Sequence, residues 1–210
     1  VLGGMGADQI TTGAGTDTIF GDNGYVQMDT VGGNLASFGT KSQSTTTGTL
    51  KIDDLGGDDV IVTQSGDKWL MGGDGSDQIS ATAGNHTVAG DNAEFRYVAL
   101  GSTGAGRLLR YETTDTKAVT GGDDVILLGD GNNVVLGGMG ADRITTGIGI
   151  DTIFGDNGYV QMDAVGGNLA AFGTKSLPTT TGTLKIADLG GDDVIVTQSG
   201  DKWLVGGDGA

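Results

Sequence analysis

A period of nine residues runs through most of this chain and constrains its fold more than any other feature. Gly3–Thr11 reads GGMGADQIT, Thr12–Phe20 reads TGAGTDTIF and Gly72–Ser80 reads GGDGSDQIS. In this register position eight is apolar, position six is most often Asp, and position four is almost always Gly. Each nonapeptide therefore predicts a tight glycine turn, a carboxylate at its edge, and a short strand with one inward apolar side chain.

A longer repeat contains the shorter one. Residues 1–76 match residues 135–210 with ten differences, which defines a long repeat unit that spans 1–134. We expect one continuous solenoid, in which the first unit, 1–134, has nonapeptides at 3–29, 54–98 and 119–134 and insertions at 30–53 and 99–118. A partial second unit, 135–210, has nonapeptides at 135–163 and 188–210 and an insertion at 164–187.

The composition excludes several classes of protein. The chain has 27 acidic and 11 basic residues, a net charge of −16, which argues against binding nucleic acid. It has no Cys, so disulfides and thiolate metal sites are excluded, and no apolar run is long enough to span a membrane. Its 43 Gly residues make it a poor helix former. The chain starts at Val1 and both ends fall inside repeats, so we interpret it as a piece of a longer protein.

Three of the nonapeptides, GGMGADQIT, GGDGSDQIS and GGMGADRIT, fit the pattern GGxGxDxUx. In this the chain resembles the RTX (repeats-in-toxin) family of calcium-binding nonapeptide-repeat proteins, of the large surface adhesin or filament type. The resemblance implies an all-β fold, a parallel β-roll or β-solenoid. Two nonapeptides would make one coil of about 18 residues. Turns would alternate between two edges, and the insertions would project as β-hairpins or loops.

The resemblance implies Ca²⁺ as the cofactor, and the residue types agree with it. Ca²⁺ takes six to eight oxygen ligands from carboxylates and backbone carbonyls. Short Asp side chains fixed in turns fit this need, and the chain has 25 Asp against two Glu, Glu94 and Glu112. The candidate metal ligands at position six are Asp8, Asp17, Asp59, Asp77, Asp124, Asp142, Asp151 and Asp193. The GDN turns have no Asp at position six, and their candidates at position two are Asp22, Asp91 and Asp156.

Counting each insertion as one turn predicts which turns share an edge. The first edge would carry most of the position-six Asp turns together with those of Val26, Phe95 and Val160, and would be rich in calcium. The second would run from Asp17 to Lys202, interrupted by the insertions. A unit would then have twelve turns, or six coils, and would advance about 29 Å.

Some residues depart from the family pattern. Lys68 and Lys202 stand where the family has Asp, and an ammonium does not ligate calcium, so we expect them to neutralise neighbouring carboxylates. We predict no ion at the step from Lys68 to His86. His86, the single histidine, is interpreted as a turn residue, since it has no second His or Cys for a zinc site. Trp69 and Trp203 are expected to pack beside an insertion, with stacking on sugars as the alternative.

The insertions contain possible hairpins. Glu94–Leu100 and Arg107–Thr113 predict two strands around a glycine-containing loop, and Tyr25–Met28 is expected to pair with Thr49–Ile52. They are either tolerated surface loops or contact points for neighbouring chains. Three of the four Arg residues fall within 96–110, which predicts a basic projection on an acidic rod.

These features favour a structural role and no enzyme activity, because the carboxylates recur in every turn and none is singled out for glycosidase chemistry. The first hypothesis is a rod, stalk or self-assembling extracellular fibre of a large secreted bacterial surface protein. The second is a calcium-dependent secretion and folding module of an RTX exoenzyme. The third is an adhesive module that acts through its insertions. Calcium and further repeats or neighbouring chains are the expected partners, without membrane insertion, at the cell surface or in the medium.

Overall fold

The computed structural model describes residues 1–30, 33–40, 56–98, 102, 105–115, 120–175 and 190–207. Their regular structure is entirely β and forms three six-stranded sheets. Sheet 1 is parallel and contains β1 (Gln9–Thr11), β5 (Val60–Val62), β7 (Gln78–Ala81), β11 (Val125–Leu128), β13 (Arg143–Thr145) and β17 (Val194–Val196). Sheet 2 is parallel and contains β2 (Asp17–Phe20), β6 (Lys68–Met71), β8 (His86–Ala89), β12 (Val134–Gly138), β14 (Asp151–Asp156) and β18 (Lys202–Val205).

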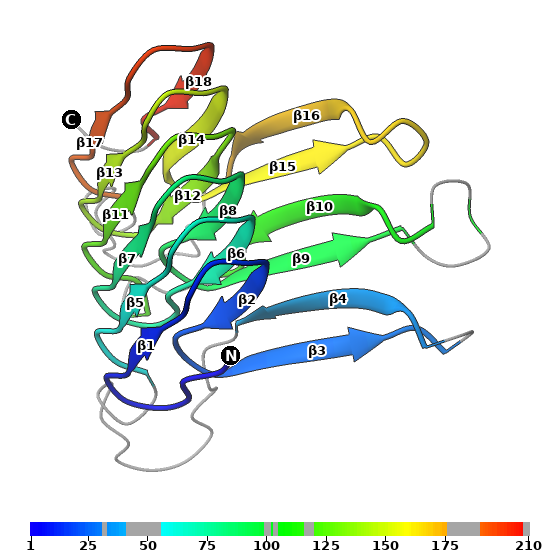
Figure 1. The fold of residues 1–210 in the computed structure, drawn as a ribbon, viewed down its shortest axis with the longest axis horizontal. Helices are drawn as coiled ribbons and strands as arrows, with labels where there is room; N and C mark the ends of the chain where they lie inside the picture. Colours follow the sequence, from blue (N-terminus) through cyan, green and yellow to red (C-terminus); the bar gives the residue numbers. More distant parts are fainter. Residues whose placement is uncertain are drawn as a thin grey trace, which may run out of the picture.

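The third sheet, called here the hairpin sheet, is antiparallel. It contains β3 (Gly24–Met28), β4 (Leu35–Thr40), β9 (Ala93–Tyr97), β10 (Leu108–Thr113), β15 (Gly158–Met162) and β16 (Leu169–Thr174). These strands form three hairpins that project from the same side of the two parallel sheets (Figure 1). The hairpins pair with one another in chain order, so the inserted segments of this chain contact each other.

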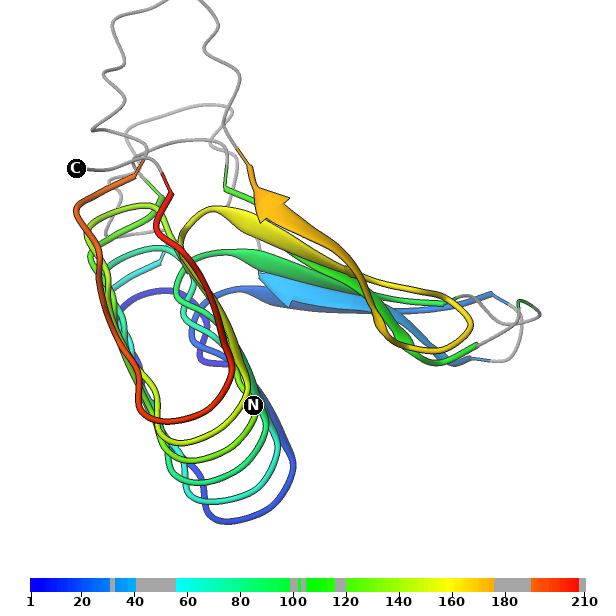
Figure 2. The same ribbon diagram turned by 90° about the horizontal axis from the view of Figure 1, so that it is seen from above.

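A coil consists of one strand of sheet 1 followed by one strand of sheet 2, and Figure 2 shows the coils stacked when viewed from above. Where coils follow directly, paired strand positions are two nonapeptides apart, as in Ile61 with Ile79. Where a hairpin intervenes the separation is larger, as in Ile79 with Ile126 and Ile10 with Ile61. The same inward position is kept across every step, because slipping by one residue would turn each apolar side chain outward.

The interior of the coils is a column of apolar side chains from the two parallel sheets. Ile61, Ile79 and Ile126 from sheet 1 pack with Leu70 and other residues of sheet 2, and all are buried. Each strand of the two parallel sheets except β18 contributes the residue at position eight of its nonapeptide, as the sequence predicts. The column holds the coils in register but leaves the charged turns at both edges.

Aromatic side chains join the hairpin sheet to sheet 2. Phe20 of β2 meets Phe38 of β4 edge-on with ring centroids 5.9 Å apart, and within the hairpin sheet Phe38 stacks on Phe95 at 4.8 Å and Phe95 on Tyr111 at 5.8 Å. Trp203 of sheet 2 meets Phe172 of β16 edge-on at 5.0 Å. The expectation that the tryptophans pack beside an insertion is therefore confirmed for Trp203. Contacts between these large rings hold the hairpins against the coils.

The structure corrects the predicted path of the chain at the GDN turns. Val26, Phe95 and Val160 do not lie in turns of the coils, because they belong to β3, β9 and β15 of the hairpin sheet. The nonapeptide register counts the first strand of each hairpin as solenoid, since the apolar pattern of that strand imitates a nonapeptide. One long unit therefore contains four coils, from β1 to β12, and advances about 19 Å instead of about 29 Å.

In the first of the longer insertions, β3 forms its hairpin with a nearer strand than the one predicted. β3 pairs with Leu35–Thr40, with Val26 opposite Phe38. The sequence pairs the same strand with Thr49–Ile52, a segment that lies outside the described residues. The closer partner requires a shorter loop, and closing a shorter loop costs less conformational entropy.

The repeat supplies a matched test of the core. Leu70 is 0% exposed, whereas its counterpart one unit later, Leu204, is 49% exposed. We expect Leu70→Ala to lower the free energy of unfolding in saturating calcium by about 2–5 kcal/mol, the usual cost of a buried Leu-to-Ala truncation. Leu204→Ala is the control and should cost much less. Urea unfolding of both variants measures the difference, and equal losses would contradict this description of the core.

Candidate metal centre

The turns of the coils form two edges with different chemistry. Edge one contains the turns that lead from sheet 2 to sheet 1, and edge two contains the turns that lead from sheet 1 to sheet 2. All three hairpins leave the coils at edge one, and edge two runs without interruption. The sequence predicts the opposite, with the insertions on the second edge, and this part of the prediction is wrong.

Six of the predicted ligands form one row on edge one. They are Asp8, Asp59, Asp77, Asp124, Asp142 and Asp193. The main-chain N–H of each of the first five donates to Oδ1 of the Asp in the next coil, with N–O distances of 2.7 to 2.9 Å. From Asp59 onward, Oδ1 of each carboxylate is thus fixed by the backbone of the preceding coil, which holds Oδ2 in a defined place.

The second oxygen of these carboxylates is buried and has no hydrogen-bond partner in the protein. This holds for Oδ2 of Asp8, Asp59, Asp77, Asp124 and Asp142. A buried polar atom without a partner is costly, so such a group needs an explanation. Here five such carboxylate oxygens recur in register along edge one. Their arrangement indicates that positive charge is required beside them.

Glycine carbonyls lie beside the unpartnered oxygens. A Cβ added at Gly72 would overlap both Oδ2 of Asp77 and the carbonyl oxygen of Gly90. The same overlap would occur at Gly90, with Oδ2 of Asp124 and the carbonyl oxygen of Gly137. Glycine at the first position of the nonapeptide therefore keeps open a space lined by a carboxylate and a carbonyl.

The electrostatics of edge one oppose a full set of bare carboxylates. Burial raises the pKa of Asp77 and of Asp142 to about 9, and neighbouring carboxylates contribute to both shifts. Asp124, between them, has its pKa raised in the same direction, first by burial and then by Asp142. Hydrogen bonds from the backbone offset only part of this effect. A divalent cation in the row would keep these groups ionised.

The available donor atoms are carboxylate and carbonyl oxygens, the types that Ca²⁺ binds. Among the described residues no three Asp, Glu or His side chains cluster closely enough to hold a metal by themselves. Side chains alone therefore do not make the site, and backbone carbonyls have to supply the remaining oxygens. A mixture of carboxylate and carbonyl oxygens is what Ca²⁺ takes, and the bound ion supplies the charge that the row of Asp lacks.

The three Asp residues of the GDN turns lie where the hairpins leave edge one. Oδ2 of Asp22 accepts the main-chain N–H of Asp74 at 2.6 Å, and Asp91 accepts those of Gly122 and Met139. Asp156 lies at the same place in the next unit and is buried. Burial raises the pKa of Asp22 to about 8, and Asp59 of the first row contributes to the shift. These carboxylates tie two neighbouring turns together beside the first row.

The sequence analysis missed a polar cluster beneath the middle hairpin. Nδ2 of Asn92 donates to Oδ1 of Asp74 at 2.5 Å and to Oδ1 of Asp115 at 3.0 Å. The hydroxyl of Thr120 donates to Asp115 at 2.8 Å. Asp115 lies inside an insertion, where the nonapeptide register assigns no position, so the sequence contains no signal for it.

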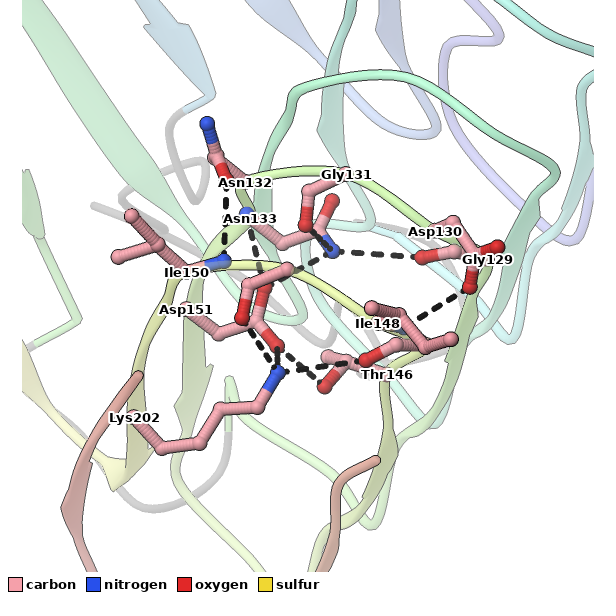
Figure 3. A network of polar contacts seen from close by, with 12 residues as sticks. Gly129, Asp130, Gly131, Asn132, Asn133, Thr146, Ile148, Ile150, Asp151 and Lys202 are labelled. Carbon is pink, nitrogen blue, oxygen red and sulfur yellow. Dashed lines mark hydrogen bonds and ion pairs between the residues drawn. The ribbon is translucent and has the colours of Figure 1, made fainter. Parts of the chain in front are cut away.

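The remaining two predicted ligands, Asp17 and Asp151, lie on edge two, and each contacts a lysine. The ammonium of Lys68 is 2.5 Å from Oδ2 of Asp17, and that of Lys202 is 2.5 Å from Oδ2 of Asp151 (Figure 3). The hydrogen bond from Lys68 lowers the pKa of Asp17. The structure thus places both lysines against carboxylates, as the sequence analysis expects. Nε2 of His86, on the same edge, lies 2.7 Å from the carbonyl oxygen of Thr82 in its own turn.

Comparison with known families agrees with this chemistry. A family model described as the RTX calcium-binding nonapeptide repeat matches four times, at residues 1–25, 53–88, 119–153 and 136–158. The chain therefore contains RTX calcium-binding nonapeptide repeats, and these repeats bind Ca²⁺. No curated protein and no solved structure matches the chain. Within the described residues no helix is long and apolar enough to cross a membrane.

The first row can be tested by removing one carboxylate. Asp77→Asn keeps the shape of the side chain but removes its charge, and we expect the calcium concentration at the folding midpoint to rise about tenfold or more. Asp58→Asn is the matched control, because it removes the same charge from an exposed side chain outside the row, which caps the N–H of Ser76. A calcium titration followed by far-UV circular dichroism compares the two. Equal midpoints for both variants would count against the row as a calcium site.

The raised pKa values predict an unusual pH dependence without calcium. Asp77 and Asp142 have folded-state pKa values of about 9, against an ordinary value near 3.8 in the unfolded chain. Their contribution to the stability of the calcium-free fold is thus complete below the lower value and is lost as the pH rises toward the higher one. Calcium-free protein should show more β-structure at about pH 5 than at about pH 8. Circular dichroism measures this, with saturating calcium as the control, and the reverse order without calcium would refute it.

Proposed function

We propose that this chain is a calcium-stabilised structural segment of a large secreted bacterial surface protein, and that it serves as part of a rod, stalk or self-assembling fibre. The calcium set in this proposal is the row on edge one together with Asp22, Asp91 and Asp156. Coils of two nonapeptides form the β-roll, and the insertions form its hairpin sheet. The length of such a segment grows with the number of units, since a solenoid contacts only its neighbours along the axis.

One observation carries the proposal: the unit repeats its geometry as well as its sequence. Gln9 pairs with Val60 in the first unit, and Arg143 pairs with Val194 at the equivalent position of the second unit. The antiparallel pairs repeat likewise, with Val26 opposite Phe38 and Val160 opposite Phe172. A unit that stacks on its own copy in an unchanged register supports a rod built from many such units.

Calcium explains how such a rod folds outside the cell. Close carboxylates on edge one disfavour the folded state until a cation binds, so binding energy becomes folding energy. An unfolded chain is suited to export, and calcium in the surroundings then drives folding. Stabilisation by bound calcium increases with its free concentration.

The hairpins bear on the partners of the rod. Arg96 lies 2.5 Å from Glu94, and Glu112 contacts Arg110 and Lys175, both at 2.9 Å. The expected basic projection is therefore largely neutralised by the two Glu residues of the chain. This favours self-association along the axis, through further hairpins in register, over attraction to the acidic edge of a neighbouring rod.

Two alternatives remain as hypotheses. A secretion and folding module of an exoenzyme would need the same calcium chemistry. Its function would not require a long unit that repeats both its sequence and its geometry. An adhesive module would act through its insertions. The repeated geometry supports the rod over both.

The proposal is tested by changing the number of units. Chains of two and four complete units should be unfolded without calcium and form rods with it, and each added unit should lengthen the rod by about 19 Å, four strand spacings. Small-angle scattering and electron microscopy measure the length. Compact particles whose length does not grow with unit number would refute the rod, and β-structure unchanged on removing calcium would refute metal-driven folding.

A further inference from the structure

On edge two, lysine and asparagine side chains donate hydrogen bonds to the carboxylates. On edge one, the corresponding carboxylates have buried oxygens without a partner. The row on edge two consists of Asp17, Lys68, His86, Asn133, Asp151 and Lys202, which follow one another from coil to coil. Within the described residues no carboxylate of this row is among the buried oxygens without a partner. The two edges of one solenoid thus differ in what they require from the solvent.

The lysine ammonium groups are coordinated by oxygens of the turn. Nζ of Lys68 donates to the carbonyl oxygens of Gly13 at 3.0 Å and Gly15 at 2.7 Å, in addition to the carboxylate of Asp17. The Lys68 side chain is 0% exposed. A buried lysine is rare unless it is paired, and here two carbonyls and one carboxylate use its three donors.

The second unit repeats the arrangement. Nζ of Lys202 donates to the carbonyl oxygens of Gly147 at 3.2 Å and Gly149 at 2.9 Å and to Oδ2 of Asp151 (Figure 3). The turn sequences differ at two places, since Ala14 and Thr16 are replaced by Ile148 and Ile150. The lysine geometry is kept despite these changes, so it does not depend on those side chains.

Asn133 fills the neighbouring turn in the same way. Its Nδ2 donates to the carbonyl oxygens of Gly129 at 3.4 Å and Gly131 at 3.2 Å and to Oδ1 of Asp151 at 3.1 Å (Figure 3). Both oxygens of Asp151 are therefore occupied, one by Asn133 and the other by Lys202 and the hydroxyl of Thr146. No oxygen of this carboxylate is left for a metal ion.

We infer that edge two does not bind calcium and that Lys68 and Lys202 take the place of the ion, each with one carboxylate and two turn carbonyls. The calcium ligands of the chain then exclude Asp17 and Asp151, although both occupy the position of the family's Asp. Calcium stabilises one edge of the solenoid, and covalently attached cations stabilise the other. The inference rests on calcium binding at edge one but not on the rod function.

The number of bound ions tests this inference. Equilibrium dialysis against calcium should give the same number of ions per chain for the wild type, Asp17→Asn and Asp151→Asn, and a smaller number for Asp77→Asn. The inference would be overturned if Asp17→Asn lowered the number of bound calcium ions as much as Asp77→Asn does. An unchanged number for Asp77→Asn would instead remove the proposed sites of edge one, so the two failures are distinguishable.

A second set of variants asks whether the lysine occupies a calcium position. Lys68→Asp and Lys202→Asp restore the family residue, and each should bind about one more ion than the wild type, because the added carboxylate and the freed carbonyls are calcium ligands. Lys175→Asp is the control, since Lys175 lies beside the hairpin sheet against Glu112. Edge-two variants that fold in calcium, shown by circular dichroism, but bind no additional ion would overturn the inference. For a variant that does not fold, Lys68→Gln provides the check: an unchanged thermal midpoint in saturating calcium would also overturn it.

Discussion

Repulsion within the row of buried carboxylates on edge one is the constraint on which this structure depends. Parallel strands stack identical turns directly above one another, so an Asp in one turn has an Asp in the next. The apolar column between the sheets does not relieve that repulsion, because it lies away from the turns. Positive charge has to enter each edge, and the nature of that charge distinguishes edge one from edge two. In the proposed function, folding of the coils and binding of the cation at edge one are therefore coupled.

The stacked coils were predictable from the sequence, whereas the start and the pairing of the hairpins were not. Ile61, Ile79 and Ile126 could be placed in the interior because one inward residue recurs at a fixed position of the nonapeptide. The row from Asp59 to Asp142 followed from the same register. Val26 and Phe95 were misplaced, because a hairpin strand also alternates apolar and polar residues and so continues the pattern after the chain has left the coil. Periodicity identifies a strand, but it does not identify which sheet the strand joins.

The candidate site shows a similar division. The spacing of Asp77 and Asp124 predicts a shared row, but the position of their unpartnered oxygens beside glycine carbonyls depends on the backbone path of two turns. Asp115 lies outside the nonapeptide register, so the sequence does not predict its place in the site. The structure shows it at the base of a hairpin, where it accepts a hydrogen bond from Asn92. The lysines of edge two were recognisable as departures from a pattern, but the two carbonyls that bind each ammonium were visible only in three dimensions.

The hairpin sheet has a mechanical consequence for a segment of this kind. All three sheets stack their strands in the same direction, so tension along the axis acts on the hydrogen bonds of all three together (Figure 1). Detaching a coil that carries a hairpin requires separating two parallel strand pairs and an antiparallel one. The stacked rings of Phe38 and Phe95, which lie on neighbouring hairpins, must part as well. The load is thereby shared between the calcium-dependent edge and a region held by aromatic packing and ion pairs, so edge one does not carry it alone.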